Sequence, residues 1–348
     1  MIEKLVRSHF HDFQPYRSAR SEVRSAEIFL DANELAAGSP VAFRNLQLHR
    51  YPDPVQTGVR TAFGERLSMP AARIFAGAGS DEIIDLLIRL ICEPGRDRIL
   101  VNEPTYGVYQ VAAEVNAVGT VVCGLDGDFQ LDLPRIRAAA GEGVKIMFIC
   151  SPNNPTGNLL RREDILALCD TWRGLVVVDE AYVDFGDPGS SLVPETLTRR
   201  NLAVLRTMSK SYGLAGIRLG YCIADPVLVE YLQKIKAPYN ISSVTAALAI
   251  EALADAGFPA AAAESIRRER IGLTARLAAL PAVVRIFPSD ANFLLVEMKD
   301  AGKAYRFLAD HGVIVRRRSE PRLRSSLRIT VGTAGENQRI VELIGQLS

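Results

Sequence analysis

The segment Leu175-Val176-Val177-Val178-Asp179-Glu180-Ala181-Tyr182 joins a continuous apolar run to two carboxylates and an aromatic side chain. A strand that is apolar at successive positions has to be covered on both faces, which is typical of parallel sheets flanked by helices. A buried carboxylate at the end of such a strand is costly unless a donor or a cation accompanies it. Asp179 therefore either accepts hydrogen bonds from loop N–H groups or belongs to a binding site.

Similar apolar runs recur on both sides of this segment and alternate with helical patterns. The expected strands are 98–101, 120–123, 145–150, 175–178, 203–206 and 219–223. The clearest helix covers 80–92, where isoleucine and leucine recur at helical spacing after an acidic first turn, and Pro94-Gly95 ends it. This alternation predicts an α/β domain with a parallel or mostly parallel sheet.

The pattern changes after about residue 243. The expected elements there are a helix-rich stretch (243–280), a strand (292–298), a helix (301–310) and two short strands (313–316 and 327–331). They predict a smaller α+β domain. We therefore expect an N-terminal arm that forms part of the small domain (1–44), a large domain (45–242) and a small C-terminal domain (243–348).

Composition excludes several classes of protein. The chain has 348 residues with 41 Lys+Arg and 40 Asp+Glu, so its net charge of +1 argues against a nucleic-acid binder. Its five cysteines are odd in number and lack C-x-x-C spacing, so neither a disulfide framework nor a metal site is expected. The N-terminus lacks a signal-peptide pattern and no apolar run approaches the ~20 residues of a membrane span, so a cytoplasmic protein is expected.

Two loops after predicted strands contain chemically useful side chains. Ser151-Pro152-Asn153-Asn154-Pro155-Thr156-Gly157 is either a rigid polar loop or a way to present an amide at the edge where α/β sheets bind ligands. Thr207-Met208-Ser209-Lys210-Ser211-Tyr212-Gly213 contains one of only seven lysines in the chain. Lys210 is either a surface lysine or an amine nucleophile that forms a Schiff base.

A third loop, Gly77-Ala78-Gly79, feeds the helix that begins at Ser80. It lacks the third glycine of a dinucleotide-binding fingerprint, which argues against a nicotinamide-dependent oxidoreductase. A glycine turn at a helix N-terminus is still a phosphate site in principle, because free N–H groups and the helix dipole face the anion.

Taken together and in this order, these segments resemble the fold-type I pyridoxal-phosphate (PLP) aminotransferases. The carrying motifs are S-P-N-N-P-T-G at 151–157, V-V-V-D-E-A-Y at 176–182 and S-K-x-x-x-L-A-G-x-R at 209–218. Further segments resemble the histidinol-phosphate aminotransferases: 13–20, 30–34, 50–53, 104–107 and 327–333. The resemblance covers nearly the whole chain and implies a large domain with a mostly parallel seven-stranded sheet between helices, plus a smaller α+β domain.

The resemblance also implies roles for the cofactor's neighbours. Lys210 would form the Schiff base and then move protons, Asp179 would hold the pyridinium nitrogen, and Tyr106 would stack on the ring. Asn154 and Tyr182 would hydrogen-bond the phenolic oxygen. The residues expected around the cofactor's phosphate are Gly79, Ser80, Asp81, Ser209 and Arg218, with Tyr51 reaching the phosphate in the neighbouring subunit of a homodimer with shared active sites.

For the substrates, the resemblance implies transamination between L-histidinol phosphate and 2-oxoglutarate, giving imidazole-acetol phosphate and L-glutamate in histidine biosynthesis. The candidates for a shared anion pocket are Tyr16, Arg316 and Arg328, with Asn33 beside them, and the neighbours Arg317, Arg318, Arg322 and Arg324 are expected to be solvated. An aromatic-amino-acid aminotransferase and a threonine-phosphate decarboxylase remain as alternatives. A cofactor-binding regulator is disfavoured because the chain has no room for a DNA-binding module.

Overall fold

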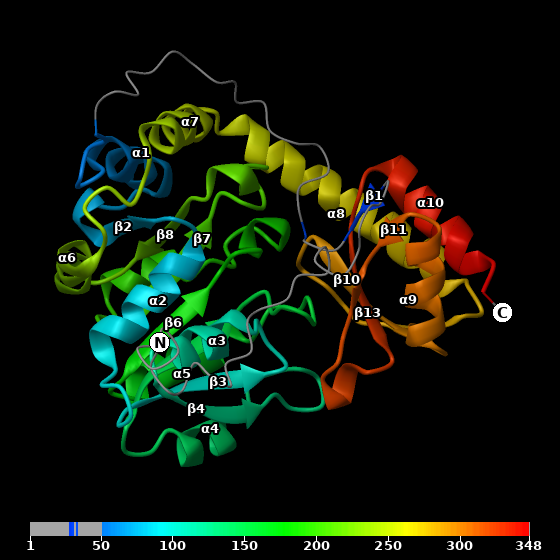
Figure 1. Cartoon of the computed structure of the whole chain (residues 1–348), viewed down its shortest axis with the longest axis horizontal. Coiled ribbons are helices and arrows are strands. Elements are labelled where there is room, and N and C mark those ends of the chain that lie inside the picture. Colours follow the sequence, from blue (N-terminus) through cyan, green and yellow to red (C-terminus); the bar gives the residue numbers. More distant parts are fainter. Residues whose placement is uncertain (1–27, 31–32, 34–50, 348) are drawn as a thin grey trace, which may run out of the picture.

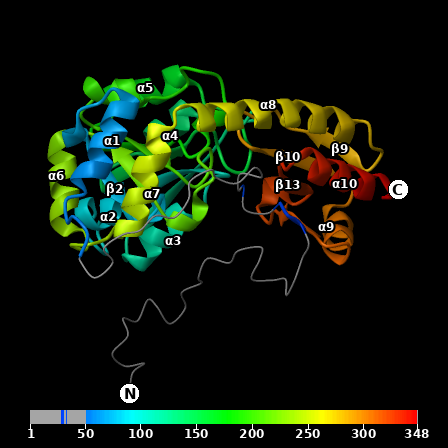
Figure 2. The same cartoon turned by 90° about the horizontal axis from the view of Figure 1, so that it is seen from above.

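The computed structural model describes residues 28–30, 33 and 51–347, and their strands form two main sheets (Figure 1). A seven-stranded sheet lies among the blue, cyan and green elements, and a four-stranded sheet lies among the orange and red ones (Figure 1). The long helix α8 (Gly257–Ala278) runs from the first group to the second, as both views show (Figures 1 and 2).

The larger sheet has the strand order β2-β8-β7-β6-β5-β3-β4. Its members are β2 (Ile74–Gly77), β3 (Arg98–Glu103), β4 (Gly119–Gly124), β5 (Val144–Cys150), β6 (Leu175–Asp179), β7 (Leu202–Thr207) and β8 (Gly220–Ile223). The pairs from β4 through β7 are parallel, whereas β8 is antiparallel to both β7 and β2. The prediction of a mostly parallel seven-stranded sheet is confirmed; β2 and the reversal at β8 were not predicted from the residue pattern.

Helices cover both faces of this sheet, which explains why its strands are apolar at successive positions. Along β6, Val176 and Val178 pack into one hydrophobic cluster, while Leu175 and Val177 pack into another on the opposite face. The helices are α1 (Thr57–Leu67), α4 (Leu133–Ala139), α5 (Arg162–Thr171) and α7 (Ser243–Ala254) on the first face, and α2 (Ser80–Ile91), α3 (Val108–Val115) and α6 (Pro226–Ile235) on the second.

The smaller sheet is antiparallel and has the order β12-β13-β10-β9. Its strands are β9 (Val283–Ile286), β10 (Phe293–Met298), β12 (Arg316–Arg317) and β13 (Ser326–Thr330). It packs with α8, α9 (Ala301–Asp310) and α10 (Ala334–Gly345) around a third hydrophobic cluster. Thr333 and Glu336 form a capping box at the start of α10, which fixes where that helix begins.

The strand expected at 313–316 is divided in the structure. Val313 and Ile314 form β11, which pairs in parallel with β1 (Ile28–Phe29), while β12 pairs with β13. The backbone therefore changes partner after Ile314. The N-terminal segment thus supplies a strand beside the smaller sheet, a pairing that no local pattern could predict.

Among the described residues, no single helix is long and apolar enough to cross a membrane. Helices α7 and α8 reach that length and composition only together, and they meet at a 76° bend. All five cysteines are buried and free, and the part of the chain that the structure describes holds no group of three or more side chains suited to a metal ion.

Candidate active site

Asp179 is the last residue of β6 and its side chain is buried, at 3% exposure. The Tyr109 hydroxyl donates a hydrogen bond of 2.7 Å to Oδ2, and the Ala181 N–H donates one of 3.1 Å to Oδ1. Burial raises the pKa of Asp179 to about 6, although both hydrogen bonds oppose the rise. The two donors are neutral, so the carboxylate is held in place while its charge remains available to a cationic ligand.

Tyr109 was not predicted as a site residue. It lies on α3, is fully buried, and stacks on Phe148 with ring centroids 4.8 Å apart. Its phenol pKa is raised well above the usual value by burial and by the Asp179 charge, so it stays a donor. The sequence signal was an aromatic residue three positions after Tyr106, but such spacing on a helix is also typical of a core side chain.

Lys210 follows β7, the parallel neighbour of β6 in the sheet. Its Nζ lies 5.6 Å from the centroid of the Tyr182 ring, and its charge acts on Asp179. Asn154 follows β5, the neighbour of β6 on the other side. Three adjacent strands therefore deliver an amide, a carboxylate and an amine to one edge, where open α/β sheets bind ligands.

The Tyr182 hydroxyl lies between two amide groups. Asn154 Nδ2 donates to it over 3.2 Å and Asn33 Nδ2 donates over 3.3 Å. Burial raises the pKa of this phenol, although Arg328 and Asn33 act in the opposite direction, so it is protonated at neutral pH. Because both lone pairs accept, the hydroxyl's own hydrogen can be donated to a ligand.

Arg328 connects the smaller sheet to this cluster. It lies on β13, is buried, and its Nη1 donates a hydrogen bond of 2.7 Å to Asn154 Oδ1. Asn33 is fixed from the same strand, because its backbone N–H donates to Thr330 Oγ1 over 3.1 Å. Asn33 and Arg328, both predicted as substrate residues, are thus brought to Asn154 and Tyr182.

The start of α2 forms a cradle with the segment around Arg218. Gly79 precedes the helix with a φ of 81°, and a Cβ there would lie 2.7 Å from Arg218 Nη2. A Cβ on Gly220 would lie 2.3 Å from the backbone nitrogen of Ser80, so only glycine permits this approach. Arg218 Nη2 lies 3.6 Å from Asp81 Oδ2. The helix N-terminus, the dipole and this guanidinium suit a phosphate.

Two more predicted cofactor residues lie near these elements. The Tyr106 hydroxyl donates to Asp81 Oδ1 over 3.2 Å, and its ring meets the Tyr109 ring edge-on at 5.5 Å. Ser209 is buried directly before Lys210, where its hydroxyl accepts from Thr207 Oγ1 over 2.9 Å. Tyr106 therefore bridges the phosphate cradle and the surroundings of Asp179.

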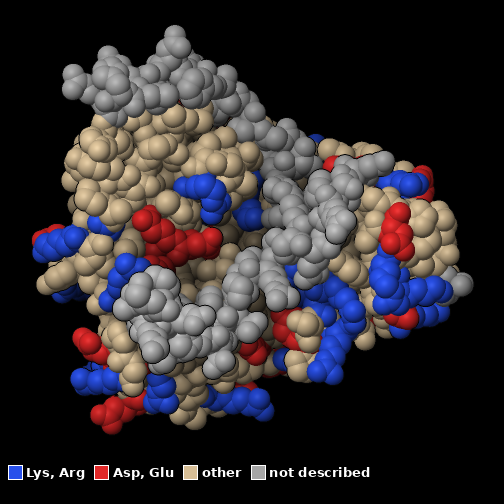
Figure 3. Space-filling view, in the orientation of Figure 1, with Lys and Arg blue, Asp and Glu red and all other residues tan. Residues whose placement is uncertain are grey.

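Arg316 on β12 is the cross-strand partner of Arg328, so the two side chains leave the same face of the sheet. It also lines a cavity of about 450 Å³ with Arg317, Arg318 and Arg324. Figure 3 shows basic side chains gathered over the end of β13, next to this edge of the small sheet. An anionic substrate is electrostatically suited to this side of the site.

Two of the arginines expected to be solvated also have structural partners. Arg322 donates to the carbonyl oxygens of Leu125 and Asp126 over 2.6 and 2.7 Å, which ties the segment between β12 and β13 to the larger sheet's layer. Arg318 is ion-paired with Glu320. Arg317, Arg322 and Arg324 are exposed, as expected, although Arg322 also has these tertiary partners. Arg318 is half-buried, so the prediction of solvation was wrong for that residue alone.

Two predicted residues stand apart from this geometry. Tyr51 is 82% exposed and stacks on Tyr239, with ring centroids 4.5 Å apart. Tyr16 lies outside the described residues. The structure thus brings the other predicted residues to the joined strand ends, the α2 cradle and the adjoining edge of the small sheet.

Comparison with known proteins accords with this arrangement. The sequence model for aminotransferases of class I and II matches residues 25–344. This chain belongs to the class I and II aminotransferase family. Among its curated relatives, the histidinol-phosphate aminotransferase of Cytophaga hutchinsonii is 43% identical over 345 residues, which cover 99% of this chain and 98% of that protein.

Solved structures of this aminotransferase family share the fold. The histidinol-phosphate aminotransferase of Clostridium acetobutylicum aligns with a TM-score of 0.85 at 26% identity, covering 92% of this chain and 98% of that one. The enzyme of the same name from Sinorhizobium meliloti, solved in complex with pyridoxal-5'-phosphate, aligns with a TM-score of 0.87 at 22% identity over 99% and 98% of the two chains.

Proposed function

We propose that this aminotransferase uses PLP to transfer an amino group between L-histidinol phosphate and 2-oxoglutarate, giving imidazole-acetol phosphate and L-glutamate, as a cytoplasmic enzyme of histidine biosynthesis. The observation that carries the proposal is that Arg328 and Asn33 from the small-sheet side join Asn154, Tyr182, Asp179 and Lys210 in one cluster. The 43% identity with a histidinol-phosphate aminotransferase over almost the full length supports the choice of substrate.

The residues present fit PLP. Asp179 is a buried carboxylate held by neutral donors, which suits a protonated ring nitrogen, and the α2 cradle with Arg218 suits the phosphate. When bound, PLP supplies an aldehyde that takes up amines and a ring that accepts the electron pair released at the substrate carbon. The protein must hold that ring, keep its nitrogen protonated and move the substrate's proton.

Each of these tasks falls to a residue of this chain. Asp179 keeps the proton on the ring nitrogen, because an adjacent anion raises the pKa of a cationic acid. Asn154 and Tyr182 hold the phenolic oxygen, Tyr182 through the hydrogen that its two amide donors leave available. Lys210 provides the amine that first holds the cofactor and then carries a proton as general base and acid.

Substrate binding requires one pocket for two anions in alternating half-reactions. Histidinol phosphate carries a phosphate tail, whereas 2-oxoglutarate and glutamate carry two carboxylates. A guanidinium fork accepts either oxyanion in bidentate geometry, which a lysine cannot do. We assign this role to Arg328 and Arg316, which face the same side of the small sheet.

The substrate assignment is tested by donor competition. Amino transfer to 2-oxoglutarate is measured with histidinol phosphate and with phenylalanine as donors, and threonine phosphate is followed for decarboxylation. We expect kcat/KM for histidinol phosphate to exceed that for phenylalanine by at least about 100-fold, because the phosphate and the guanidinium forks form charge-assisted hydrogen bonds. Equal use of phenylalanine, or decarboxylation of threonine phosphate, would overturn the assignment.

A homodimer with shared active sites is part of the proposal. Large apolar side chains are exposed on α6, on α7 and on the segments before α1 and between α6 and α7: Val55, Val227, Tyr231, Ile235, Tyr239 and Ile250. An exposed apolar area of this kind is typical of a subunit interface. Tyr51 is also exposed and stacks on Tyr239, which supports the proposal that it reaches the partner's cofactor phosphate.

Subunit mixing tests the sharing of sites. Tyr51→Ala and Lys210→Ala should each be poorly active as homodimers. In a mixed dimer, one site would combine an intact Lys210 with the partner subunit's Tyr51, so activity should reappear after the two variants are unfolded and refolded together. The control is the same procedure on each variant alone, and a mixture no more active than the sum of the two would contradict shared sites.

A further inference from the structure

A buried ion cluster lies beside the active site and contains none of the residues assigned to cofactor or substrate. Arg206, near the end of β7, forms ion pairs with Glu180 and Asp184, which follow β6. The side chains of Arg206 and Glu180 are 10% and 1% exposed, whereas that of Asp184 is 32% exposed. One guanidinium thus serves two carboxylates from the segment that also contains Asp179 and Tyr182.

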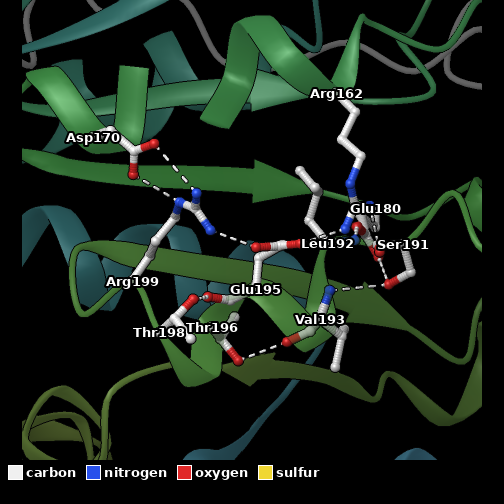
Figure 4. A network of polar contacts seen from close by, with 10 residues as sticks. All are labelled: Arg162, Asp170, Glu180, Ser191, Leu192, Val193, Glu195, Thr196, Thr198 and Arg199. Atoms are coloured by element: carbon white, nitrogen blue, oxygen red, sulfur yellow. Dashed lines mark hydrogen bonds and ion pairs between the residues drawn. The ribbon is translucent and has the colours of Figure 1, made fainter. Parts of the chain in front are cut away.

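Glu180 is anchored on its other side by the segment before the 3-10 helix Val193–Leu197 (Figure 4). Ser191 Oγ donates to Glu180 Oε2 over 2.6 Å, and the Leu192 N–H donates to Oε1 over 2.5 Å. Burial raises the pKa of Glu180, and Arg206 acts against this rise. The segment after β6 is therefore fixed at Glu180 by two donors from one loop and by the ion pair with Arg206.

Asp184 holds both ends of the segment that contains Lys210. Its Oδ1 accepts from Arg206 Nη2, and its Oδ2 accepts from the hydroxyl of Ser211. Arg206 and Ser211 are the two ends of the stretch 206–211, and Lys210 lies inside it. A single carboxylate therefore closes this stretch into a loop and joins it to the segment bearing Asp179.

We propose that Asp184 and Arg206 are positioning residues for Lys210: together they clamp the stretch 206–211 so that the lysine amine is held at a fixed place relative to Asp179 and Tyr182. This inference rests on the proposed function. Proton transfer by a flexible side chain depends on a backbone that does not shift, since a displacement of about 1 Å can cost about 100-fold in rate. Neither clamp residue has to touch cofactor or substrate to have this effect.

The principal test is Asp184→Asn, with Arg199→Gln as control. Asparagine keeps the shape of aspartate but removes the charge that Arg206 and Ser211 share. The side chain of Asp184 is partly exposed, so this variant is expected to fold. Arg199 forms ion pairs with Glu195 and Asp170, and it lies at the other end of the drawn network from Glu180 (Figure 4). Arg206→Gln is the second variant, expected to act in the same direction.

Two readouts distinguish positioning from general stability. In the PLP-loaded enzyme, Asp184→Asn should lower kcat by about 10- to 100-fold while KM for both substrates changes less than about 2-fold, because binding groups are untouched. In the cofactor-free chain, backbone hydrogen exchange at 208–213 should be faster than in the parent, while Arg199→Gln leaves it unchanged.

Parent-like kcat together with parent-like exchange in Asp184→Asn would overturn the clamp, as would an equal loss of kcat in Arg199→Gln. If Arg206→Gln does not fold, the results for Asp184→Asn alone decide whether the two residues position Lys210. The hydrogen-exchange arm needs neither cofactor nor substrate, so a failure of the proposed transamination and a failure of the clamp give different results.

Discussion

Lys210→Ala is expected to abolish amino transfer, with kcat lowered by at least about 1,000-fold. The reaction needs an amine that holds the cofactor's aldehyde and then carries a proton, and each role is worth orders of magnitude. Absorbance spectroscopy of the PLP-loaded protein provides a second measurement, because the visible band of cofactor bound through Lys210 should disappear. A variant that kept this band would rule out Lys210 as the attachment point.

The control for this prediction is Lys145→Ala. Lys145 is an exposed lysine near the start of β5, at the end of that strand opposite Asn154, so its loss should leave kcat, KM and the spectrum unchanged. Lys210→Arg completes the set. Arginine keeps the positive charge but does not lose its proton at any accessible pH, so this variant should be as inactive as the alanine variant. Activity in Lys210→Arg would show that charge alone suffices.

Much of the larger sheet could be predicted because each of its central strands is a continuous apolar run that is visible in the local sequence. Apolar runs such as Ile146–Ile149 are needed wherever helices cover both faces, and the strand-end positions of Asn154, Asp179 and Lys210 follow from the parallel arrangement. The reversal at β8 could not be predicted in this way, since a short buried strand has the same composition whichever direction it runs.

The supporting side chains were the hardest to predict. Tyr109 stands in α3 at a position that a core aromatic residue could equally occupy, and only the fold reveals that its hydroxyl meets Asp179. Arg206 is similar. A charged residue inside a buried strand must have an oppositely charged partner, but the sequence does not show which residue that partner is. Such contacts join segments distant in sequence, so motif spacing shows the groups that do chemistry but not the groups that position them.

The buried Asp179 illustrates how function and stability oppose each other. Its pKa lies at about 6 against an ordinary 3.8, so the folded chain binds this proton more tightly than the unfolded chain does. An acid whose folded-state pKa is raised lowers the stability of the fold as pH increases from about 4 to about 6, and this loss persists at higher pH. The anion is nevertheless the form that pairs with a protonated ring nitrogen. In the cofactor-free protein, the ionised Asp179 carboxylate therefore destabilises the fold at the position where the ring nitrogen of PLP requires an anion.

Asp179→Asn should accordingly have opposite effects on catalysis and on stability. We expect kcat to fall by at least about 100-fold, because an amide cannot keep the ring nitrogen protonated. We also expect the cofactor-free variant to be more stable than the parent by about 1 to 3 kcal/mol at pH 8, measured by urea unfolding, and equally stable near pH 4, where the parent's carboxyl is neutral.

Tyr109→Phe is the matched control for Asp179→Asn, because it removes one donor to the carboxylate and keeps the ring that stacks on Phe148. Loss of that hydrogen bond should raise the pKa of Asp179 further, so the pH below which PLP affinity declines should move upward from about 6. Asp179→Asn should bind PLP weakly and lack this step, since its side chain has no proton to gain. The measurement is PLP affinity, determined by equilibrium titration of the parent and the variants at a series of pH values. Because the ionisations of free PLP affect every protein equally, they cancel when the proteins are compared. If PLP affinity declined at the same pH in Asp179→Asn as in the parent, the decline would have to come from another titrating group.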